Sequence, residues 1–457
     1  MINGPTAHND DPGTLVVGLG KTGLSCVRHL RGLGRRVAAV DSRRSPPALE
    51  AVNEEFPEVP ITLGGFPWDA FEGADDIVVS PGVSLAEPAL KRAIAAHKPV
   101  CGDIELFARA VGATPVVAVT GSNGKSTVAT MVVDMLRIDG RRVKVGGNIG
   151  MPALSLLDGE RPEVYVLELS SFQLETTDSL EPRVAALLNV SADHMDRYDD
   201  VEAYARTKAR IFAGDGAMVL NRDDPRVAAM ATEDRRVIFY TLRTPARGEF
   251  GLRGGDGGDY LSAGETPVVA ARELQVAGLH NVANGLAAMA VASVLGVSHA
   301  SMARALKDFR GLPHRCQLIA EAAGVRWFDD SKATNVGATV ASIAGLGARE
   351  DVPRLILIAG GDAKDADFGA LEEPLRRHVR VLVLIGRDGA RVAAAAPREL
   401  ETVQAEGMSD AVAIAYEHAR AGDSVLLAPA CASFDMYTNY EARGDDFTAE
   451  VRRVLGS

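Results

Sequence analysis

The sequence predicts an α/β protein of three domains in which helices cover mainly parallel sheets. Two stretches follow the order strand, glycine-rich turn, helix, with the turns at residues 18–23 and 121–127. Beyond residue 312, further strands each end in polar residues, as parallel strands of open α/β sheets do. A chain of 457 residues is long enough for several domains. We place the domains at residues 1–103, 104–311 and 312–457.

Composition and charge exclude several classes of protein. The formal charge of −12 argues against a general surface for nucleic acid or anionic membranes, which would need clustered Lys and Arg. The N-terminus lacks a basic stretch followed by an apolar core, and the longest apolar stretch, near Leu286 to Val297, is too short to span a bilayer. The four cysteines are far apart and form no CxxC pair, so they indicate neither a disulfide framework nor a zinc site. We expect a cytoplasmic protein that does not insert into a membrane.

The first domain opens with a dinucleotide-type fingerprint. Strand Thr14 to Val17 leads into Gly18-Leu19-Gly20-Lys21-Thr22-Gly23, a helix to about Leu33, and a strand Arg36 to Val40 that ends at Asp41. Alone, this pattern would suggest a Rossmann-like dehydrogenase domain. The turn itself, however, binds a diphosphate on a helix N-terminus, which any nucleotide diphosphate satisfies.

The central domain opens with a P-loop-type phosphate cradle. Strand Pro115 to Thr120 is followed by Gly121-Ser122-Asn123-Gly124-Lys125-Ser126-Thr127 and then by helical apolar spacing. Lys125 can reach the β- and γ-phosphates, and the Ser126 hydroxyl can ligate Mg²⁺. The full motif has glycine at the position of Val119, so this is a shortened variant. It predicts ATP or a relative; an ordinary turn, or a motor or switch GTPase, stays open from this stretch alone.

Three polar residues lie at the carboxyl ends of two later strands, where ligands of open α/β sheets gather beside the cradle. Glu168 interrupts the apolar strand 163–169, and Asp193 and His194 come just after the strand 184–190. A buried carboxylate is costly unless it is paired or bound to a metal, although Glu168 could also lie on an edge strand. We favour Mg²⁺ ligation for Glu168 and, with less support, for His194, because magnesium prefers oxygen ligands.

Two helices of the central domain carry further candidates. On pattern alone, Lys208 is a solvated lysine of the helix 202–212. Asn281 and Asn284 lie three residues apart at the start of an alanine-rich helix, where they could read a base edge or simply cap the helix. The glycine-rich stretch 248–264 predicts a hairpin or a loop.

The third domain has strands at 325–328, 355–359, 381–385 and 425–428. Polar residues follow each of them, among them Asp330 and Lys332 after the first and Ser433 after the last. This pattern predicts a second Rossmann-like parallel sheet without a phosphate cradle of its own.

Ten segments resemble the Mur ligases in order and rough spacing, across nearly the whole chain. They are TGSNGKST, GGNIG, ELSSFQLE, NVSADHMDRY, the helix carrying Lys208, HNVANGLAA, GLPHRCQ, DDSKATN, GGDAKDADF and PACASFDMY. The similarity is strongest to the family members that add D-glutamate to UDP-N-acetylmuramoyl-L-alanine. The stereochemistry of the glutamate rests on this resemblance alone.

The resemblance implies an ADP-forming acid–amino-acid ligase of peptidoglycan synthesis, and hence of cell-wall biogenesis, cell shape and cell division. ATP phosphorylates the substrate carboxylate, and the amine of glutamate attacks the acyl phosphate. It also implies a first domain that binds the UDP substrate, a central ATP-binding domain and a glutamate-binding third domain. The implied partners are these small molecules, with no nucleic acid, and we expect a monomer.

The resemblance also assigns residues to roles. Catalysis is implied for Lys125, Glu168, His194, Lys208 and Arg315. Binding of ATP is implied for Gly121, Ser122, Asn123, Gly124, Lys125, Ser126, Thr127, Asn281, Asn284, Arg315 and Asp330. Binding of the UDP substrate is implied for Gly20, Lys21, Thr22, Ser42, Arg43, Ser80, Asn148 and His194. Binding of glutamate is implied for Lys332, Thr334, Lys364, Ser433 and Tyr440. Ser126, Glu168 and His194 would hold two Mg²⁺ ions, with Lys208 as a CO₂-derived carbamate supporting them.

Two residues depart from the family pattern: Lys21 is basic where an apolar residue is expected, and Tyr440 stands in place of Phe. The alternatives are another Mur ligase, a folylpolyglutamate synthase-like ligase, a nucleotide switch protein, or a dinucleotide-dependent oxidoreductase. We further expect the third domain to swing in when ATP binds, bringing Arg315 and Lys332 to the central domain.

Overall fold

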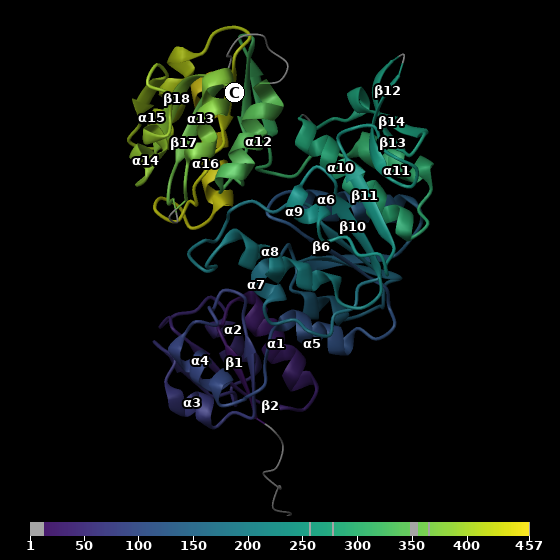
Figure 1. Ribbon diagram of the computed structural model, residues 1–457. Helices are drawn as coiled ribbons and strands as arrows, with labels where there is room; N and C mark the ends of the chain where they lie inside the picture. The colour runs from purple at the N-terminus through teal and green to yellow at the C-terminus, as the bar shows by residue number, and fades with distance from the viewer. Residues whose placement is uncertain (1–12, 256, 277, 348–354, 364–365, 457) are drawn as a thin grey trace, which may run out of the picture.

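The computed structural model forms three lobes in chain order, and each lobe has its own sheet (Figure 1). It describes residues 13–255, 257–276, 278–347, 355–363 and 366–456. The predicted fold class, three α/β domains with mainly parallel sheets, is confirmed. Within the described residues, no helix is both long enough and apolar enough to cross a bilayer.

The first lobe contains a five-stranded parallel sheet in the order β3-β2-β1-β4-β5. The central strands are apolar runs buried on both faces, as expected for a parallel sheet between helices. The carboxyl ends of β1 and β2 carry the glycine turn and Asp41, so both lie at one edge of the sheet. Its strands are β1 (Gly13–Val17), β2 (Arg36–Asp41), β3 (Ile61–Leu63), β4 (Asp76–Val79) and β5 (Val100–Cys101). Its helices are α1 (Lys21–Gly32), α2 (Leu49–Glu55), α3 (Trp68–Glu72), α4 (Pro88–Ala95) and α5 (Asp103–Ala110).

The central lobe contains a nine-stranded sheet in the order β14-β13-β12-β11-β10-β9-β6-β8-β7. Strands β6 to β12 run parallel, while β12, β13 and β14 form an antiparallel edge, so the glycine-rich stretch 248–264 is a hairpin. Its strands are β6 (Val116–Thr120), β7 (Val143–Gly147), β8 (Val164–Glu168), β9 (Val184–Leu187), β10 (Ala217–Asn221), β11 (Val237–Thr241), β12 (Phe250–Gly255), β13 (Gly258–Ala263) and β14 (Thr266–Ala270). Its helices are α6 (Lys125–Ile138), α7 (Ser171–Leu174), α8 (Val201–Ala209), α9 (Pro225–Ala228), α10 (Leu279–Val294) and α11 (His299–Asp308), with 3₁₀ turns at Ala153–Leu157, Arg210–Phe212 and Ala271–Glu273.

Helices α6 and α10 form the main core of this lobe. The run Leu286–Ala292 in α10 is buried completely, and it packs with α6 over the same face of the sheet. This packing fixes the N-terminus of α6, which starts directly at the phosphate loop.

The third lobe contains a six-stranded sheet in the order β15-β16-β20-β17-β18-β19, in which only β15 is antiparallel. The polar residues after β16 and β20 therefore meet at one edge, because these two strands are neighbours. Its strands are β15 (Gln317–Ala322), β16 (Val325–Asp329), β17 (Leu355–Gly360), β18 (Val379–Ile385), β19 (Glu401–Gln404) and β20 (Ser424–Leu427). Its helices are α12 (Val336–Gly347), α13 (Glu372–His378), α14 (Gly389–Ala394), α15 (Met408–His418) and α16 (Tyr440–Leu455), with a 3₁₀ turn at Gly369–Leu371.

Candidate active site

The phosphate loop between β6 and α6 takes the backbone shape that its glycines permit. Gly124 precedes α6 with φ of 83°, a left-handed conformation that favours glycine. A Cβ atom there would also lie 2.4 Å from Oδ1 of Asn284. The loop therefore depends on glycine for both conformation and close packing, and it lies directly beside α10.

The segment after β9 holds this loop in place. The backbone N–H of Ser122 donates to the Asn189 carbonyl (2.9 Å), and that of Asn123 donates to Asn189 Oδ1 (2.8 Å). The Ser122 hydroxyl donates to the Ser191 carbonyl (3.1 Å). The same segment continues to Asp193 and His194, so these bonds place both residues beside the loop.

Two lysines meet at the carbonyl of Gly121. Lys125 Nζ donates to it at 2.9 Å and Lys208 Nζ at 3.0 Å. Burial lowers the pKa of both side chains, and for Lys208 the nearby charge of Lys125 lowers the pKa further. The arrangement favours a neutral amine on Lys208 over an ammonium.

The interpretation of Lys208 as a solvated helix lysine was wrong. Only 1% of the residue is exposed, because this face of α8 packs toward the phosphate loop. Its Nζ also lies over the Tyr204 ring, 4.4 Å from the centroid. A helical pattern places a residue on a face but does not show what covers that face.

Glu168 ends β8, which pairs with β6 on one side and β7 on the other, so it is not on an edge strand. It is 2% exposed. One carboxylate oxygen accepts a hydrogen bond from Ser126 Oγ (2.6 Å) and the other accepts one from Asn148 Nδ2 (2.7 Å). The buried carboxylate is therefore paired with two neutral donors and with no described cation.

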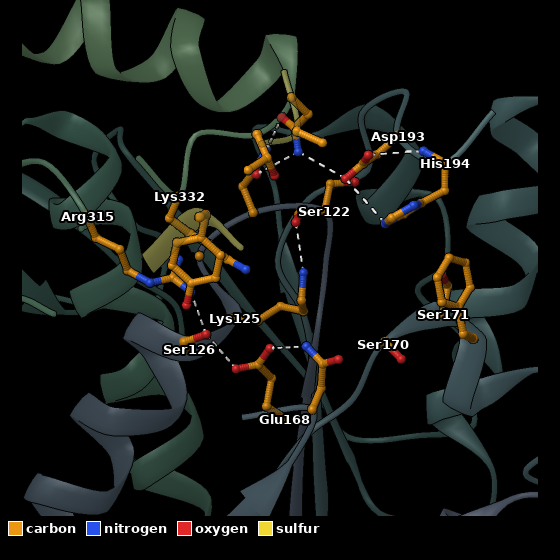
Figure 2. Close-up of a pocket in the computed structure, with 18 of the residues that line it drawn as sticks. Ser122, Lys125, Ser126, Glu168, Ser170, Ser171, Asp193, His194, Arg315 and Lys332 are labelled. Carbon is orange, nitrogen blue, oxygen red and sulfur yellow. Dashed lines mark hydrogen bonds and ion pairs between the residues drawn. The ribbon is translucent and has the colours of Figure 1, made fainter. Parts of the chain in front are cut away.

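His194 and Asp193 lie on the opposite side of the same cavity from Arg315 and Lys332 (Figure 2). His194 has φ of 58°, and its ring packs edge-on against Phe172 at 4.7 Å between centroids. Its Nε2 lies 3.8 Å from Oδ2 of Asp193. The ring is thus held between an aromatic side chain and a carboxylate.

The donor set beside Lys125 is consistent with magnesium. No cluster of three or more His, Cys, Asp or Glu side chains suited to a metal occurs among the described residues. Mg²⁺ does not require one, since it commonly uses one or two carboxylates together with waters and substrate phosphates. The buried Glu168 and the Ser126 hydroxyl, 2.6 Å apart, supply such oxygen donors at the N-terminus of α6.

Arg315 comes from the segment that joins the central and third domains. Its flanking residues His314 and Cys316 both have positive φ, 59° and 49°, and His314 Nδ1 is bonded to Asp329 (2.7 Å). This backbone directs Arg315 Nη2 to Ser126 Oγ, to which it donates at 2.7 Å. A cation from the third-domain side therefore reaches the phosphate loop.

One cavity of about 410 Å³, here called the central cavity, is lined by Lys125, Ser126, Glu168, Asp193, His194, Lys208 and Arg315. The residues expected to bind glutamate also line it: Lys332, Thr334, Ser433 and Tyr440. Lys364 lies outside the described residues. Burial, then Arg315 and Lys125, lower the pKa of Lys332 to about 8, and its Nζ lies 4.0 Å from the Tyr440 ring centroid.

An adjoining cavity of about 300 Å³ lies between α10 and α12. Asn281, Asn284, Asp330 and Thr127 line it. Asn284 Nδ2 donates to Asn281 Oδ1 (3.3 Å), and both residues lie inside α10, whose N-cap is Gly278 and has no side-chain cap. The two amides therefore face the cavity, and simple helix capping does not account for them.

A third cavity, here called the first-domain cavity, lies over the carboxyl edge of the first sheet. It is lined by residues expected to bind the UDP substrate: Gly20, Lys21, Thr22, Ser42, Arg43, Ser80 and Asn148. His194 lines the central cavity instead, whereas Asn148 lines both. One side chain thus connects the first-domain cavity with the central cavity.

Asp41 is already fully engaged by its own domain. It accepts bonds from the Leu19 N–H (2.7 Å), the Arg43 N–H (2.8 Å) and the Arg43 guanidinium. Burial alone would raise its pKa, but the bonds from Arg43 and Leu19 outweigh that effect and lower the pKa. In a dehydrogenase this carboxylate would bind the ribose hydroxyls, so its engagement weighs against that alternative.

No sequence pattern pointed to Arg443, which is 1% exposed inside α16. Its guanidinium donates to Ser331 and to the carbonyls of Cys431 and Ala432, at 2.9–3.2 Å. It thereby joins the ends of β16 and β20, which carry Lys332 and Ser433. A charged residue in a polar helix has no pattern that would reveal this role.

Comparisons with known proteins agree along the whole chain. Three family models match: Mur ligase MurD-like N-terminal domain at residues 13–102, Mur ligase middle domain at 119–292, and Mur ligase glutamate ligase domain at 314–431. The UDP-N-acetylmuramoylalanine–D-glutamate ligase of Nitrosococcus oceani is 49% identical over 455 residues, covering 100% of both chains. The protein of the same name from Pseudomonas putida is 49% identical over 431 residues, covering 94% of this chain and 95% of its own.

Solved structures support the fold. The UDP-N-acetylmuramate–alanine ligase of Thermotoga maritima superposes with a TM-score of 0.60 at 17% identity, covering 97% of this chain and all of its own. The MurF ligase of the same organism, solved in complex with ADP, gives a TM-score of 0.61 at 18% identity and covers 85% of this chain and 91% of its own.

Proposed function

This chain belongs to the Mur ligase family, and we propose that it is the member that joins D-glutamate to UDP-N-acetylmuramoyl-L-alanine at the expense of ATP. Its relatives of that name share almost half of their residues with it over their full length. The reaction forms an amide, ADP and phosphate, and it serves peptidoglycan precursor synthesis.

One observation carries the proposal: all three domains supply side chains to connected cavities. Asn148 links the first-domain cavity to the phosphate loop, and Arg315 extends from the third-domain side to Ser126 at 2.7 Å. A protein that only bound or hydrolysed a nucleotide would not need the first and third domains at this position. A ligase needs all three, since it must bring a nucleotide-linked acid, ATP and an amine together.

The charges suit transfer of a phosphoryl group to a carboxylate. Lys125, whose Nζ is bonded to the Ser122 carbonyl, and Arg315, bonded to Ser126 Oγ, would neutralise the charge of the transferring phosphate. Asn281, Asn284 and Asp330 would hold the adenosine in the adjoining cavity. Lys332, Thr334, Lys364, Ser433 and Tyr440 would receive glutamate, whose carboxylates match lysines and hydroxyls. The amine of glutamate would then attack the acyl phosphate and release phosphate.

Ser126, Glu168 and His194 would hold magnesium, and Lys208 would take part as a carbamate. Bound magnesium supplies electrostatic stabilisation of the phosphate oxygens. Carbamate formation needs a neutral amine, and burial beside Lys125 favours that form of Lys208. The modification would replace a second cation next to Lys125 with an anion. The Glu168 carboxylate and the carbamate would then supply two negative charges toward two magnesium ions, with phosphate oxygens supplying the rest.

The setting of this activity is the cytoplasm, where ATP and the UDP-linked precursor are available. We further propose that the enzyme acts as a monomer.

The deciding experiment is an amino-acid panel with the purified enzyme, ATP, Mg²⁺ and UDP-N-acetylmuramoyl-L-alanine. Phosphate release and the mass of the product are measured for each amino acid. We expect D-glutamate alone to give rapid phosphate release and a product larger by one glutamate residue. Preference for another amino acid would point to a different Mur ligase, and phosphate release independent of any amino acid would contradict a ligase.

A further inference from the structure

Asn335 occupies a junction that the proposed chemistry does not yet use. It directly precedes α12 in the third domain and is 9% exposed. Its Oδ1 accepts a hydrogen bond from the Ala338 N–H at 2.9 Å, three residues further on. This is the bond of a helix N-cap, so the side-chain oxygen has a role within its own domain.

The amide nitrogen of the same side chain points out of the third domain. Asn335 Nδ2 donates to Oδ2 of Asp193 at 3.0 Å and to Oδ1 of Asn123 at 3.2 Å. Asn123 Nδ2 returns a longer bond of 3.4 Å to Asn335 Oδ1. Both partners belong to the central domain, which makes Asn335 a bridge between the two domains.

The two partners lie at two different working parts of the central cavity. Asn123 is a residue of the phosphate loop, and its backbone N–H is fixed by Asn189 at 2.8 Å. Asp193 accepts the His194 N–H at 3.0 Å and lies beside that ring, as Figure 2 shows. One side chain of the third domain therefore touches both the loop that would hold phosphate and the carboxylate that orients His194.

The chemistry of the position explains why the residue is asparagine. The position requires a short side chain with one hydrogen-bond acceptor toward α12 and two hydrogen-bond donors toward the central domain. Asp, Ser or Thr could cap the helix, but Asp has no donor when ionised and a hydroxyl has only one. Glutamine has the same groups on a longer stem, which suits an N-cap less well. Among short side chains, asparagine alone meets all three requirements.

We propose that Asn335 is a positioning residue that couples the approach of the third domain to the conformation of the phosphate loop and of Asp193. When the third domain is in place, the amide of Asn335 completes the hydrogen bonds of Asn123 and Asp193. The same segment, between β16 and α12, carries Lys332 and Thr334. The glutamate-binding residues thus arrive together with a contact that orders the phosphate side.

The variant Asn335→Asp separates the two roles of the side chain. It keeps the cap of α12 but replaces both donors with a carboxylate facing that of Asp193. Losing a charge-assisted and a neutral hydrogen bond and adding repulsion should lower kcat for ligation by roughly 30- to 100-fold. Asn335→Ser keeps the cap without adding charge and should cost roughly 5- to 10-fold. Affinity for UDP-N-acetylmuramoyl-L-alanine, measured by calorimetry, should not change, because its site lies mainly in the first domain.

Exchange of the two side chains provides the sharpest test. In Asp193→Asn the new amide can donate to a carboxylate at position 335, so the pair is restored with donor and acceptor reversed. We expect Asn335→Asp to cost less than about 3-fold in kcat in the Asp193→Asn background, against the much larger cost in the wild-type background. If Asn335 served only to cap α12, Asn335→Asp would cost little, and equally little in both backgrounds.

A second readout does not depend on turnover. Small-angle scattering with a non-hydrolysable ATP analogue and the UDP substrate should show compaction of the wild type and much less of Asn335→Asp, with compaction recovered in the double variant. Equal kcat and equal compaction for Asn335→Asp and wild type, or equal costs in both backgrounds, would overturn the proposal. The kinetic arm rests on the proposed function: if the wild type makes no amide, that function fails, while the scattering comparison still decides the role of Asn335.

Discussion

The molecule contains two glycine turns between a strand and a helix, and they differ in what surrounds them. The turn at residues 18–23 is backed by Asp41, whose oxygens are all engaged by Leu19 and Arg43, and its lysine, Lys21, is exposed. Ionisable side chains that are costly to bury surround the turn at residues 121–127. They are Glu168, Lys208 and Lys125, and burial lowers the pKa of Lys125. The carboxylate at the first turn is satisfied by hydrogen bonds within its own domain, whereas the second turn has several buried ionisable groups around it.

The difference separates holding a phosphate from transferring one. Both turns offer backbone N–H groups and a helix N-terminus, which suffice to bind an anion. Transfer needs in addition charges that are fixed in advance where charge develops, and keeping them away from water costs stability. Of the two turns, the second is the one with such charges around it in the described residues: Glu168, Lys125 and Lys208 of the central domain, and Arg315 from the third-domain side. A glycine motif alone therefore identifies an anion site and not a reaction.

The largest effect should come from removing the lysine of the second turn. Lys125→Met keeps length and bulk but removes the charge beside the transferring phosphate. We expect kcat to fall by roughly 10³-fold or more, with little change in affinity for the UDP substrate. Steady-state phosphate release with all substrates saturating is the measurement. Loss of less than about tenfold would mean that the two turns do not differ as described.

The next effect tests why a second lysine is buried at this turn. Lys208→Ala should lower kcat by roughly 10²-fold, since the variant cannot form the carbamate that would support magnesium. Enzyme equilibrated with ¹³C-labelled bicarbonate should give a carbamate carbon signal in the wild type and none in Lys208→Ala. An unmodified Lys208 in fully active enzyme would contradict this account.

The pH dependence of KM should differ between glutamate, whose proposed site includes Lys332, and the UDP substrate, whose proposed site includes the first turn. The pKa of Lys332 is about 8, so its positive charge is present below pH 8 and is lost as the pH rises through that value. Because this charge attracts the carboxylates of glutamate, KM for glutamate should rise by roughly tenfold between pH 7 and pH 9. KM for the UDP substrate, measured in the same series, should stay nearly constant. A parallel rise in both would show that the pH effect is not local to the third domain.

The smallest effect is the matched control in the first turn. Lys21 is exposed, and an exposed charge contributes little because water screens it. Lys21→Met should therefore raise KM for the UDP substrate by only about 2- to 3-fold and leave kcat unchanged. A loss of kcat comparable to that of Lys125→Met would abolish the distinction between the turns.

The sequence predicted the parts of the fold that depend on local pattern. Apolar runs followed by polar residues identified the central strands of all three sheets, and the glycines identified both turns. The strands that were missed are short or lie at edges: β3, β5, β14, β15 and β19. Edge strands are half exposed and carry a weaker apolar signal, and β5 spans only two residues.

The site residues also divide into those that a local sequence pattern predicts and those that it does not. The residues of the glycine turns could be predicted as binding residues because the motif itself indicates phosphate binding. Lys208, Asn335 and Arg443 could not, because their roles arise only when distant segments meet: Lys208 with Gly121, Asn335 with Asn123 and Asp193, and Arg443 with the ends of two strands. A single sequence records none of these distances. The family resemblance supplied Lys208, but its burial and its shared carbonyl are properties of the folded chain.

The position of Arg315 in the connecting segment, between two left-handed residues, has a consequence for the end of the catalytic cycle. Arg315 lies where the third domain begins, and its guanidinium reaches Ser126 Oγ of the phosphate loop. If the third domain moves away when product is released, as we expect, the Arg315 charge leaves the phosphate loop with it. Water that enters such an opened site would meet the nucleotide without this cation, so we expect the movement to limit unproductive hydrolysis.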